Sequence, residues 1–219
     1  MLMNSVEKAM MNNPAHAALQ RHFEMPMLLQ MGGPIPGRRI LEVGCGRGIG
    51  TELILARSGA ERVDTFDLDS EMVALARRRL RRHGDRVRVG VGDVEHIEAG
   101  DGAYDAVFDF GIIHHVRDWR NALSEIYRVL KPGGRFSAEE VREKFILDPL
   151  WRRVLVHPLE DRFSHDRFRQ ALIETGFEIV ASRQLWDQFA WFVADKPAVP
   201  RQTRAADGRA AVMSSEATR

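Results

Sequence analysis

Four glycines stand at alternate positions directly after a short apolar run, because Gly44, Gly46, Gly48 and Gly50 follow residues 39–43. Glycine lets the backbone turn tightly and lets a ligand approach the main chain where a Cβ atom would collide with it. The helix expected to begin near Gly48 points its free N–H groups toward the same place. This strand, turn and helix predict a site for a nucleotide-type cofactor.

The spacing of the glycines narrows the choice of cofactor. A dinucleotide fingerprint needs glycine at its first, third and sixth positions, but the sixth residue is Ile49 counted from Gly44 and Thr51 counted from Gly46. The chain has no Gly-Lys-Ser or Gly-Lys-Thr, which excludes a phosphate loop. Glu42 would repel a pyrophosphate but attract the cationic sulfonium and ammonium groups of S-adenosylmethionine. Charge therefore favours S-adenosylmethionine.

Apolar runs alternate with segments of helical period from residue 39 onward. The expected strands are residues 39–43, 62–67, 87–91, 106–110 and 135–141, and the helices between them include residues 70–83 and 121–130. This alternation is typical of βαβ units and a parallel sheet. We therefore predict an α/β fold with a Rossmann-like, doubly wound sheet.

The C-terminal part of this pattern adds an antiparallel element. A helix capped by Ser164 and ended by Gly176 precedes two β-like runs, residues 178–185 and 189–194, which only three residues separate. So short a connection predicts an antiparallel hairpin at the edge of the sheet. Earlier in the chain, Lys131-Pro132-Gly133-Gly134 predicts a helix stop and a turn.

Residues 42–48 resemble motif I of the class I S-adenosylmethionine-dependent methyltransferases, Glu/Asp-x-Gly-x-Gly-x-Gly. Later motifs match in order: Asp67 stands 23 residues after Gly44, Gly92-Asp93-Val94 follows the third strand, and Arg-Val-Leu-Lys-Pro-Gly-Gly at residues 128–134 is typical of the small-molecule branch. The resemblance extends over residues 38–196 and implies the seven-stranded methyltransferase fold.

This resemblance implies the cofactor contacts. Asp67 would accept hydrogen bonds from both ribose hydroxyls, Asp93 would bind the adenine amine, and the methionine moiety would pass Asp109. Two carboxylate oxygens suit a vicinal diol and would reject a 2′-phosphate. Cys45 is expected to be a small filler rather than a nucleophile. The predicted cofactor-binding set is Glu42, Gly44, Cys45, Gly46, Gly48, Asp67, Leu68, Asp93, Val94 and Asp109.

The candidate catalytic residues follow the fourth and fifth strands. His114 and His115 come where the family's acceptor pocket opens, and imidazole suits a general base because its pKa lies near working pH. The alternative is that the pair only shapes the entry to the next helix. Glu140, beside Glu139, stands where related enzymes often hold an acceptor-side acid, although both glutamates are equally compatible with solvent exposure. Neighbouring histidines point in different directions on regular structure, so we predict no metal.

Composition bounds the remaining possibilities. The 219 residues carry a net charge of +1, which gives no general attraction to nucleic acid, and the single cysteine cannot form an internal disulfide. No signal-peptide pattern or membrane span is evident, which predicts a cytoplasmic enzyme. The arginine-rich residues 77–82 are expected to be a solvated helix face rather than an RNA contact. The oligomeric state cannot be inferred.

We divide the chain into an N-terminal helical lid segment (residues 1–37), a catalytic domain (38–196) and a disordered tail (197–219). Seven of the nine methionines lie in the first 31 residues, which suits either an adaptable lid over the cofactor or an ordinary packed helix. The methyl acceptor is expected to contact residues 1–37 and 142–163.

The sequence thus predicts a methyltransferase acting on a small molecule, at oxygen or nitrogen, by direct displacement. Two alternatives stay open: an RNA or protein methyltransferase, and a non-catalytic partner subunit that binds S-adenosylmethionine. The first alternative lacks support from an Asn-Pro-Pro-Tyr or Asp-Pro-Pro-Tyr motif, since Asp109-Phe110-Gly111-Ile112 stands in its place.

Overall fold

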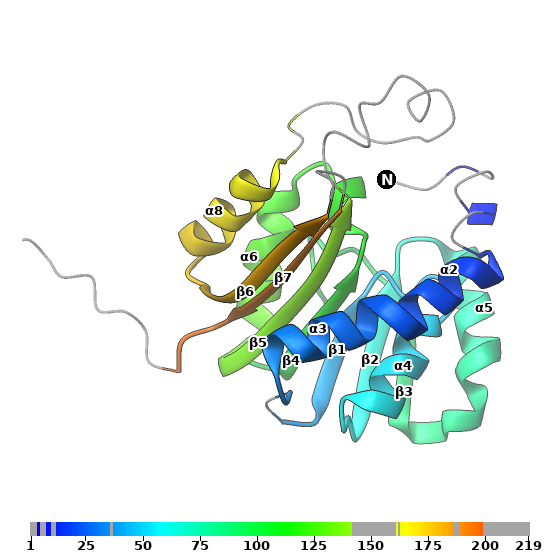
Figure 1. Ribbon diagram of the computed structural model, residues 1–219. Coiled ribbons are helices and arrows are strands. Elements are labelled where there is room, and N and C mark those ends of the chain that lie inside the picture. Colours follow the sequence, from blue (N-terminus) through cyan, green and yellow to red (C-terminus); the bar gives the residue numbers. More distant parts are fainter. Residues whose placement is uncertain are drawn as a thin grey trace, which may run out of the picture.

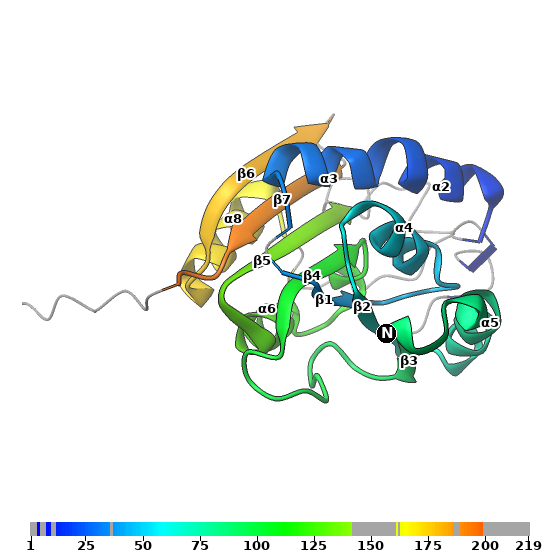
Figure 2. The same cartoon turned by 90° about the horizontal axis from the view of Figure 1, so that it is seen from below.

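A mixed β-sheet forms the centre of the molecule (Figures 1 and 2). The computed structural model describes residues 4, 8–9, 12–35, 37–141, 161, 163–185 and 189–198. Within these residues the sheet has seven strands in the order β3-β2-β1-β4-β5-β7-β6. Strands β1 to β5 run parallel, and β7 lies antiparallel between β5 and β6. The predicted α/β fold with an antiparallel C-terminal hairpin is confirmed.

The elements alternate along the chain as the hydrophobic pattern predicted. The strands are β1 (Arg39–Val43), β2 (Arg62–Asp67), β3 (Val87–Val91), β4 (Tyr104–Phe110), β5 (Leu130–Val141), β6 (Glu178–Leu185) and β7 (Phe189–Asp195). The helices are α2 (Pro14–Leu19), the π-helical turn η1 (Gln20–Glu24), α3 (Met25–Gly32), α4 (Ile49–Arg57), α5 (Ser70–Leu80), the 3₁₀ turns η2 (Arg81–Arg86) and η3 (Ile113–His115), α6 (Trp119–Val129) and α8 (His165–Thr175).

Helices cover both faces of the sheet, and a large apolar core lies on each face. Helices α3 and α4 lie on one face, where Met25, Leu28 and Leu53 pack against Val63 and Phe108. Helices α6 and α8 lie on the other face (Figure 2), where a second group of buried side chains packs: Leu123, Ile126, Phe136, Phe168 and Phe192. Because successive side chains of a strand point to opposite faces, each central strand contributes to both cores.

The segment Lys131-Pro132-Gly133-Gly134 differs from its expected form. Helix α6 ends at Val129, as a helix stop requires, but the tetrad belongs to strand β5 rather than to a free turn. Tyr104 pairs with Leu130 while Ala106 pairs with Arg135, so the extra residues of β5 form an irregularity in the pairing. Gly133 takes a positive φ of 79° there, which glycine tolerates.

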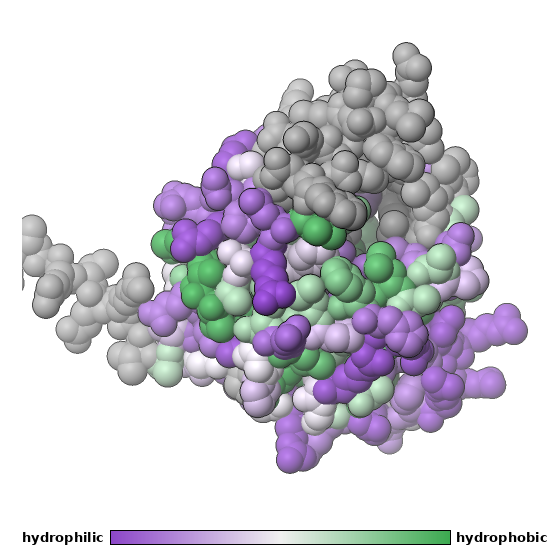
Figure 3. Space-filling view, viewed as in Figure 1, coloured by the Kyte–Doolittle hydropathy of each residue, from purple (hydrophilic) through white to green (hydrophobic). Residues whose placement is uncertain are grey.

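The arginine-rich residues 77–82 lie on α5 and η2, where hydrophilic side chains gather on the surface (Figure 3). Arg77 donates to the Val89 carbonyl, and Arg79 and Arg82 form ion pairs with Glu52. Several of these guanidinium groups are therefore used to hold α5 against its neighbours.

Two further expectations concern the acceptor-contacting segment with the C-terminal tail, and membrane spans. Residues 142–160 and the 199–219 part of the predicted tail lie outside the described residues. Among the helices that the structure describes, none combines the length and apolar character needed to cross a membrane.

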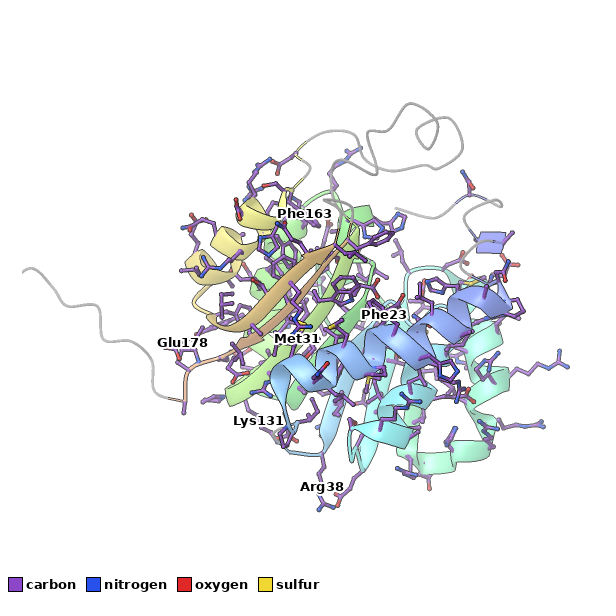
Figure 4. All side chains as sticks on the ribbon, viewed as in Figure 1. Phe23, Met31, Arg38, Lys131, Phe163 and Glu178 are labelled. Carbon is purple, nitrogen blue, oxygen red and sulfur yellow. The ribbon has the colours of Figure 1, made fainter. Side chains whose placement is uncertain are left out.

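Trp119 joins α6 to α8, and its removal tests the second core. Its side chain is fully buried, its ring centroid lies 4.9 Å from that of Phe163 (labelled in Figure 4), and its Nε1 donates to the Asp161 carbonyl at 2.9 Å. We expect Trp119→Ala to lower the free energy of unfolding by about 3–5 kcal/mol. Denaturant unfolding measures this change. The half-exposed Leu75 is the control, since Leu75→Ala should change stability by no more than about 0.5 kcal/mol; equal losses in the two variants would contradict the assignment.

Candidate cofactor and acceptor site

The glycine-rich turn after β1 is shaped by contacts that exclude a side chain. Gly44 has a φ of +72°, and a Cβ atom there would lie 2.3 Å from Cγ2 of Ile112. Gly46 also has a positive φ, +49°, but a Cβ atom there would meet nothing within 4 Å. Gly44 therefore lets the turn pack against the loop after β4, whereas Gly46 faces open space.

That open space is a cavity of about 400 Å³ at the carboxyl ends of β1, β2 and β4. This is where ligands bind in open parallel sheets. Its wall comes from five parts of the chain: the N-terminal segment before and along α2 and η1 (Asn12, His16, Gln20), the glycine-rich turn and α4 (Glu42, Gly44, Cys45, Gly46, Arg47, Ile49, Gly50), the end of β2 and start of α5 (Phe66, Asp67, Leu68, Asp69, Met72), the loop after β3 (Gly92, Asp93, Val94, Glu95) and the loop after β4 (Phe110, Gly111, Ile112, His115, Val116, Arg117).

Glu42 is the buried acid of this wall, with only 1% of its surface exposed. Its carboxylate accepts hydrogen bonds from the hydroxyl groups of Thr51 and Thr65. Among the described residues it has no ion-pair partner. Burial is the main cause that raises the pKa of Glu42 to about 8, and the negative charges of Asp67 and Asp109 add to the rise. The site thus holds a carboxyl group that a cationic ligand would stabilise in its charged form.

Asp67 and Asp93 follow neighbouring strands and both line the cavity. The Asp67 carboxylate accepts from the backbone N–H of Gly46 at 2.8 Å and from that of Asp69 at 2.9 Å, which fixes its orientation. Burial raises the pKa of Asp67 above its usual value. The Asp93 carboxylate accepts from the N–H of Glu95 at 2.9 Å.

The other members of the predicted cofactor set lie at different depths. Gly44, Cys45, Gly46, Leu68 and Val94 also line the cavity. Cys45 is buried, which raises the pKa of its thiol and suits a neutral packing role.

Gly48 and Asp109 lie outside the cavity wall. Gly48 is instead the N-cap residue of α4, in the left-handed conformation, and it packs against Leu80. Asp109 is fully buried and accepts from the N–H of Ile112, so it supports the loop whose outer side forms the wall.

The three candidate catalytic residues occupy two different places. His115 lines the cavity, but His114 and Glu140 lie behind it, 4% and 0% exposed. Glu140 accepts from the N–H groups of Ile113 and His114 and contacts Nδ1 of His114 at 2.6 Å. The two imidazole rings lie 4.3 Å apart between centroids. Glu140 and His114 thus hold the short turn that places His115 at the cavity.

The N-terminal part of the wall was not anticipated residue by residue. Asn12, just before α2, His16 on α2 and Gln20 at the start of η1 line the cavity. His16 and Gln20 are four residues apart, a spacing that puts two side chains on one side of a helix, and this was the available signal in the sequence. Burial, together with the charge of Arg47, lowers the pKa of His16.

Comparison with known proteins shows which proteins this chain resembles. Residues 40–134 match the family model described as "Methyltransferase domain". Over 120 residues the chain is 37% identical to a malonyl-[acyl-carrier protein] O-methyltransferase of Serratia marcescens, covering 55% of this chain and 44% of that protein. It is also 37% identical over 108 residues to a ubiquinone biosynthesis O-methyltransferase of Sodalis glossinidius, covering 49% of this chain and 43% of that protein.

A solved structure supports the fold. The S-adenosylmethionine-dependent methyltransferase of Aquifex aeolicus has a TM-score of 0.69 at 20% identity, over 88% of this chain and 98% of that one. The sheet is Rossmann-like, and its cavity lies at the carboxyl ends of the parallel strands, beside the glycine-rich turn after β1. Residues 40–134 carry a methyltransferase domain, and the chain has the fold of S-adenosylmethionine-dependent methyltransferases. The chain spans less than half the length of the two curated relatives.

The described residues fit that cofactor. Glu42 supplies a buried carboxyl group without a counter-ion, and the backbone at Gly46 faces empty space that a side chain does not fill. A cationic, nucleoside-containing ligand complements both features.

Glu42 predicts a pH dependence of cofactor binding. Its pKa is about 8 in the free protein, and a cationic ligand favours the ionised form, so binding below that pH must release a proton. Affinity for S-adenosylmethionine should therefore rise between pH 6 and pH 8, by up to about tenfold per pH unit, and then level off. Calorimetry across this range measures the change.

Glu42→Gln is the matched control, because it keeps the shape but cannot ionise. This variant should bind more weakly at pH 8 and should lose the part of the pH dependence that Glu42 contributes. If wild-type and variant proteins give parallel pH profiles, Glu42 does not face the cationic part of the cofactor.

Proposed function

We propose that this protein transfers the methyl group of S-adenosylmethionine to oxygen or nitrogen of a small-molecule acceptor by direct displacement. The observation that carries the proposal is the position of Glu42, Asp67 and Asp93 around one cavity, at the ends of β1, β2 and β3. In this arrangement Glu42 binds the cationic amino-acid end of the cofactor, Asp67 the ribose diol and Asp93 the adenine amine. Asp109 contributes by holding the loop that passes the methionine moiety.

For the displacement, the protein mainly has to hold the acceptor and the methyl group in position and to exclude water. When bound, S-adenosylmethionine supplies a methyl group on a sulfonium sulfur, which is already an excellent leaving group. The wall around the loop after β4 holds the acceptor in line and excludes water. The N-terminal segment before and along α2 and η1 contributes Asn12, His16 and Gln20 to the same enclosure.

His115 is the proposed general base for an acceptor that carries a proton. Its side chain lines the cavity, whereas the ring of His114 contacts Glu140 behind the wall. The Glu140 carboxylate holds the backbone of η3 through the N–H groups of Ile113 and His114. Glu140 and His114 are therefore positioning residues for His115.

Three observations favour a small acceptor over RNA or protein. The cavity is closed on one side by the N-terminal helix and has a volume typical of small-molecule sites. Two relatives are named as O-methyltransferases, one of malonyl-[acyl-carrier protein] and one of ubiquinone biosynthesis, and neither is named for RNA. The net charge of +1 offers no general attraction to RNA.

Asp67→Ala tests the cofactor assignment. Because it removes two charge-assisted hydrogen bonds to the ribose, affinity for S-adenosylhomocysteine should fall by about a hundredfold. The exposed Asp85 is the control, since Asp85→Ala should leave affinity unchanged. Calorimetry on both variants gives the comparison, and unchanged affinity in Asp67→Ala would overturn the assignment.

Labelled S-adenosylmethionine separates an enzyme from a non-catalytic binding subunit. Incubation with fractionated cell extract should produce demethylated cofactor and move the label into the metabolite fraction. Label in RNA or protein would support the alternative acceptor classes. Cofactor binding without any turnover in any fraction would support the binding subunit.

His115→Ala tests the general base once an acceptor with a proton is in hand. We expect kcat to fall by about 10²–10⁴-fold, with cofactor affinity unchanged. The exposed His22 provides a control, because His22→Ala should keep full activity. An unaltered kcat in His115→Ala would remove the histidine from the chemistry.

A further inference from the structure

Two buried glutamates meet where the N-terminal helix crosses the sheet, outside every motif of the cofactor site. Glu24, the last residue of η1, and Glu139, on β5, are 2% and 9% exposed. The two carboxyl groups lie close enough for the charge of Glu24 to act on Glu139. A pair of acids in this position brings together segments more than a hundred residues apart in the sequence.

Among the described residues, no positive charge compensates this pair. In the part of the chain that the structure describes, neither Glu24 nor Glu139 has a Lys, Arg or His ion-pair partner. Burial raises the pKa of Glu24 to about 7, and burial with the neighbouring acids Glu24, Glu140 and Asp109 raises that of Glu139 well above its usual range. Two carboxyl groups so close cannot both ionise at low cost, so they share a proton.

Aromatic side chains border the same pair. Trp191 on β7 is the strand partner of Glu139, so the two side chains lie beside each other on one face of the sheet. Its ring is 4% exposed, and its Nε1 is buried without a hydrogen-bond partner among the described residues. The ring of Phe23 meets Trp191 edge-on with 5.6 Å between centroids. Phe23 is labelled in Figure 4 on the N-terminal helical stretch.

The cluster of Phe23, Glu24, Glu139 and Trp191 adjoins the cavity. Gln20, at the other end of the same π-helical turn, lines the cavity, and so does Phe110, the strand partner of Glu139 on β4. The π-helical turn buries Gln20 and Glu24 while the residues between them stay exposed. Such turns are rare and frequently occur at functional sites.

We propose that Glu24 and Glu139, with Trp191 and Phe23 as aromatic walls, bind an ammonium group of the methyl acceptor. This inference rests on the proposed function, which it deepens by assigning the acceptor to the class of amines. A primary ammonium group donates to the carboxylates of both glutamates, and the rings attract its charge. Trp191 Nε1 donates to an oxygen atom carried near the amine. The cation replaces the shared proton, which is released on binding.

A pair of probes of equal length tests this recognition. n-Butylamine is cationic at neutral pH and 1-butanol is not, and their binding is measured by calorimetry with and without S-adenosylhomocysteine. We expect n-butylamine to bind at least about tenfold more tightly than 1-butanol. Its affinity should rise between pH 6 and pH 8, because the probe competes with the shared proton. Equal binding of the two probes, or binding of neither, overturns the proposal.

The variants locate the effect. Glu24→Gln and Glu139→Gln should each weaken n-butylamine binding by about tenfold and abolish its rise with pH. Binding of S-adenosylhomocysteine should stay unchanged in both. Glu98→Gln, at an exposed position, is the control and should behave as the wild type. If n-butylamine binds equally to all four proteins, it binds elsewhere and the proposal fails.

A third variant tests the buried indole donor. 2-Methoxyethylamine carries an ether oxygen near its amine and should bind more tightly than n-butylamine to the wild type. Trp191→Phe keeps an aromatic wall but removes Nε1, so this difference should vanish. A difference that persists in Trp191→Phe contradicts the role of Nε1.

The labelled-extract experiment separates this inference from the proposed function. Methylated products should be retained on a cation exchanger at neutral pH. Labelled metabolites that pass through the exchanger would overturn the amine assignment and leave methyl transfer intact. A protein that binds n-butylamine in the expected way but binds no S-adenosylhomocysteine would instead overturn the proposed function.

Discussion

The rest of the site depends on the burial of the Glu42 carboxyl group at the end of β1. Two threonine hydroxyls, from α4 and β2, satisfy it, but no cation does so among the described residues. A buried carboxylate without a counter-ion is costly, so the site favours a ligand that brings the positive charge. The glycine-rich turn, the fixed Asp67 and the loop supported by Asp109 all surround the space where such a ligand binds.

A second constraint is the alternation of side chains along β5. Glu139 and Glu140 are adjacent in the sequence but point to opposite faces of the sheet, because successive residues of a strand do so. Glu140 therefore reaches His114 and the turn before α6, whereas Glu139 reaches Glu24 beneath the N-terminal helix. Two adjacent residues of β5 thus serve two places. Glu140 holds the turn that carries the proposed base His115, and Glu139 belongs to the proposed acceptor subsite.

Much of the fold followed from the sequence because its signals are local. Strands β1, β2 and β3 have the predicted bounds, since each is a short segment with Val, Ile, Leu or Phe that is closed by glycine or an acid. Likewise, the residues of the cofactor wall stand at strand ends, where a parallel sheet brings them together. The depth of Asp109, His114 and Glu140 could not be inferred, because it depends on which face of β5 supports the loop after β4. The meeting of Glu24 with Glu139 depends on how a distant helix crosses the sheet, which periodicity does not specify.

The strand order also has a consequence for how the chain assembles. β7 is made after β6, yet it lies between β5 and β6. During synthesis the edge of β5 therefore stays open until β7 has emerged, and β6 has no place in the sheet before then. Folding as the chain leaves the ribosome must pass through a state with this unpaired edge, which is the feature that invites aggregation. Trp191 lies on β7, so the contact between Phe23 and Trp191 forms only when β7 has joined the sheet.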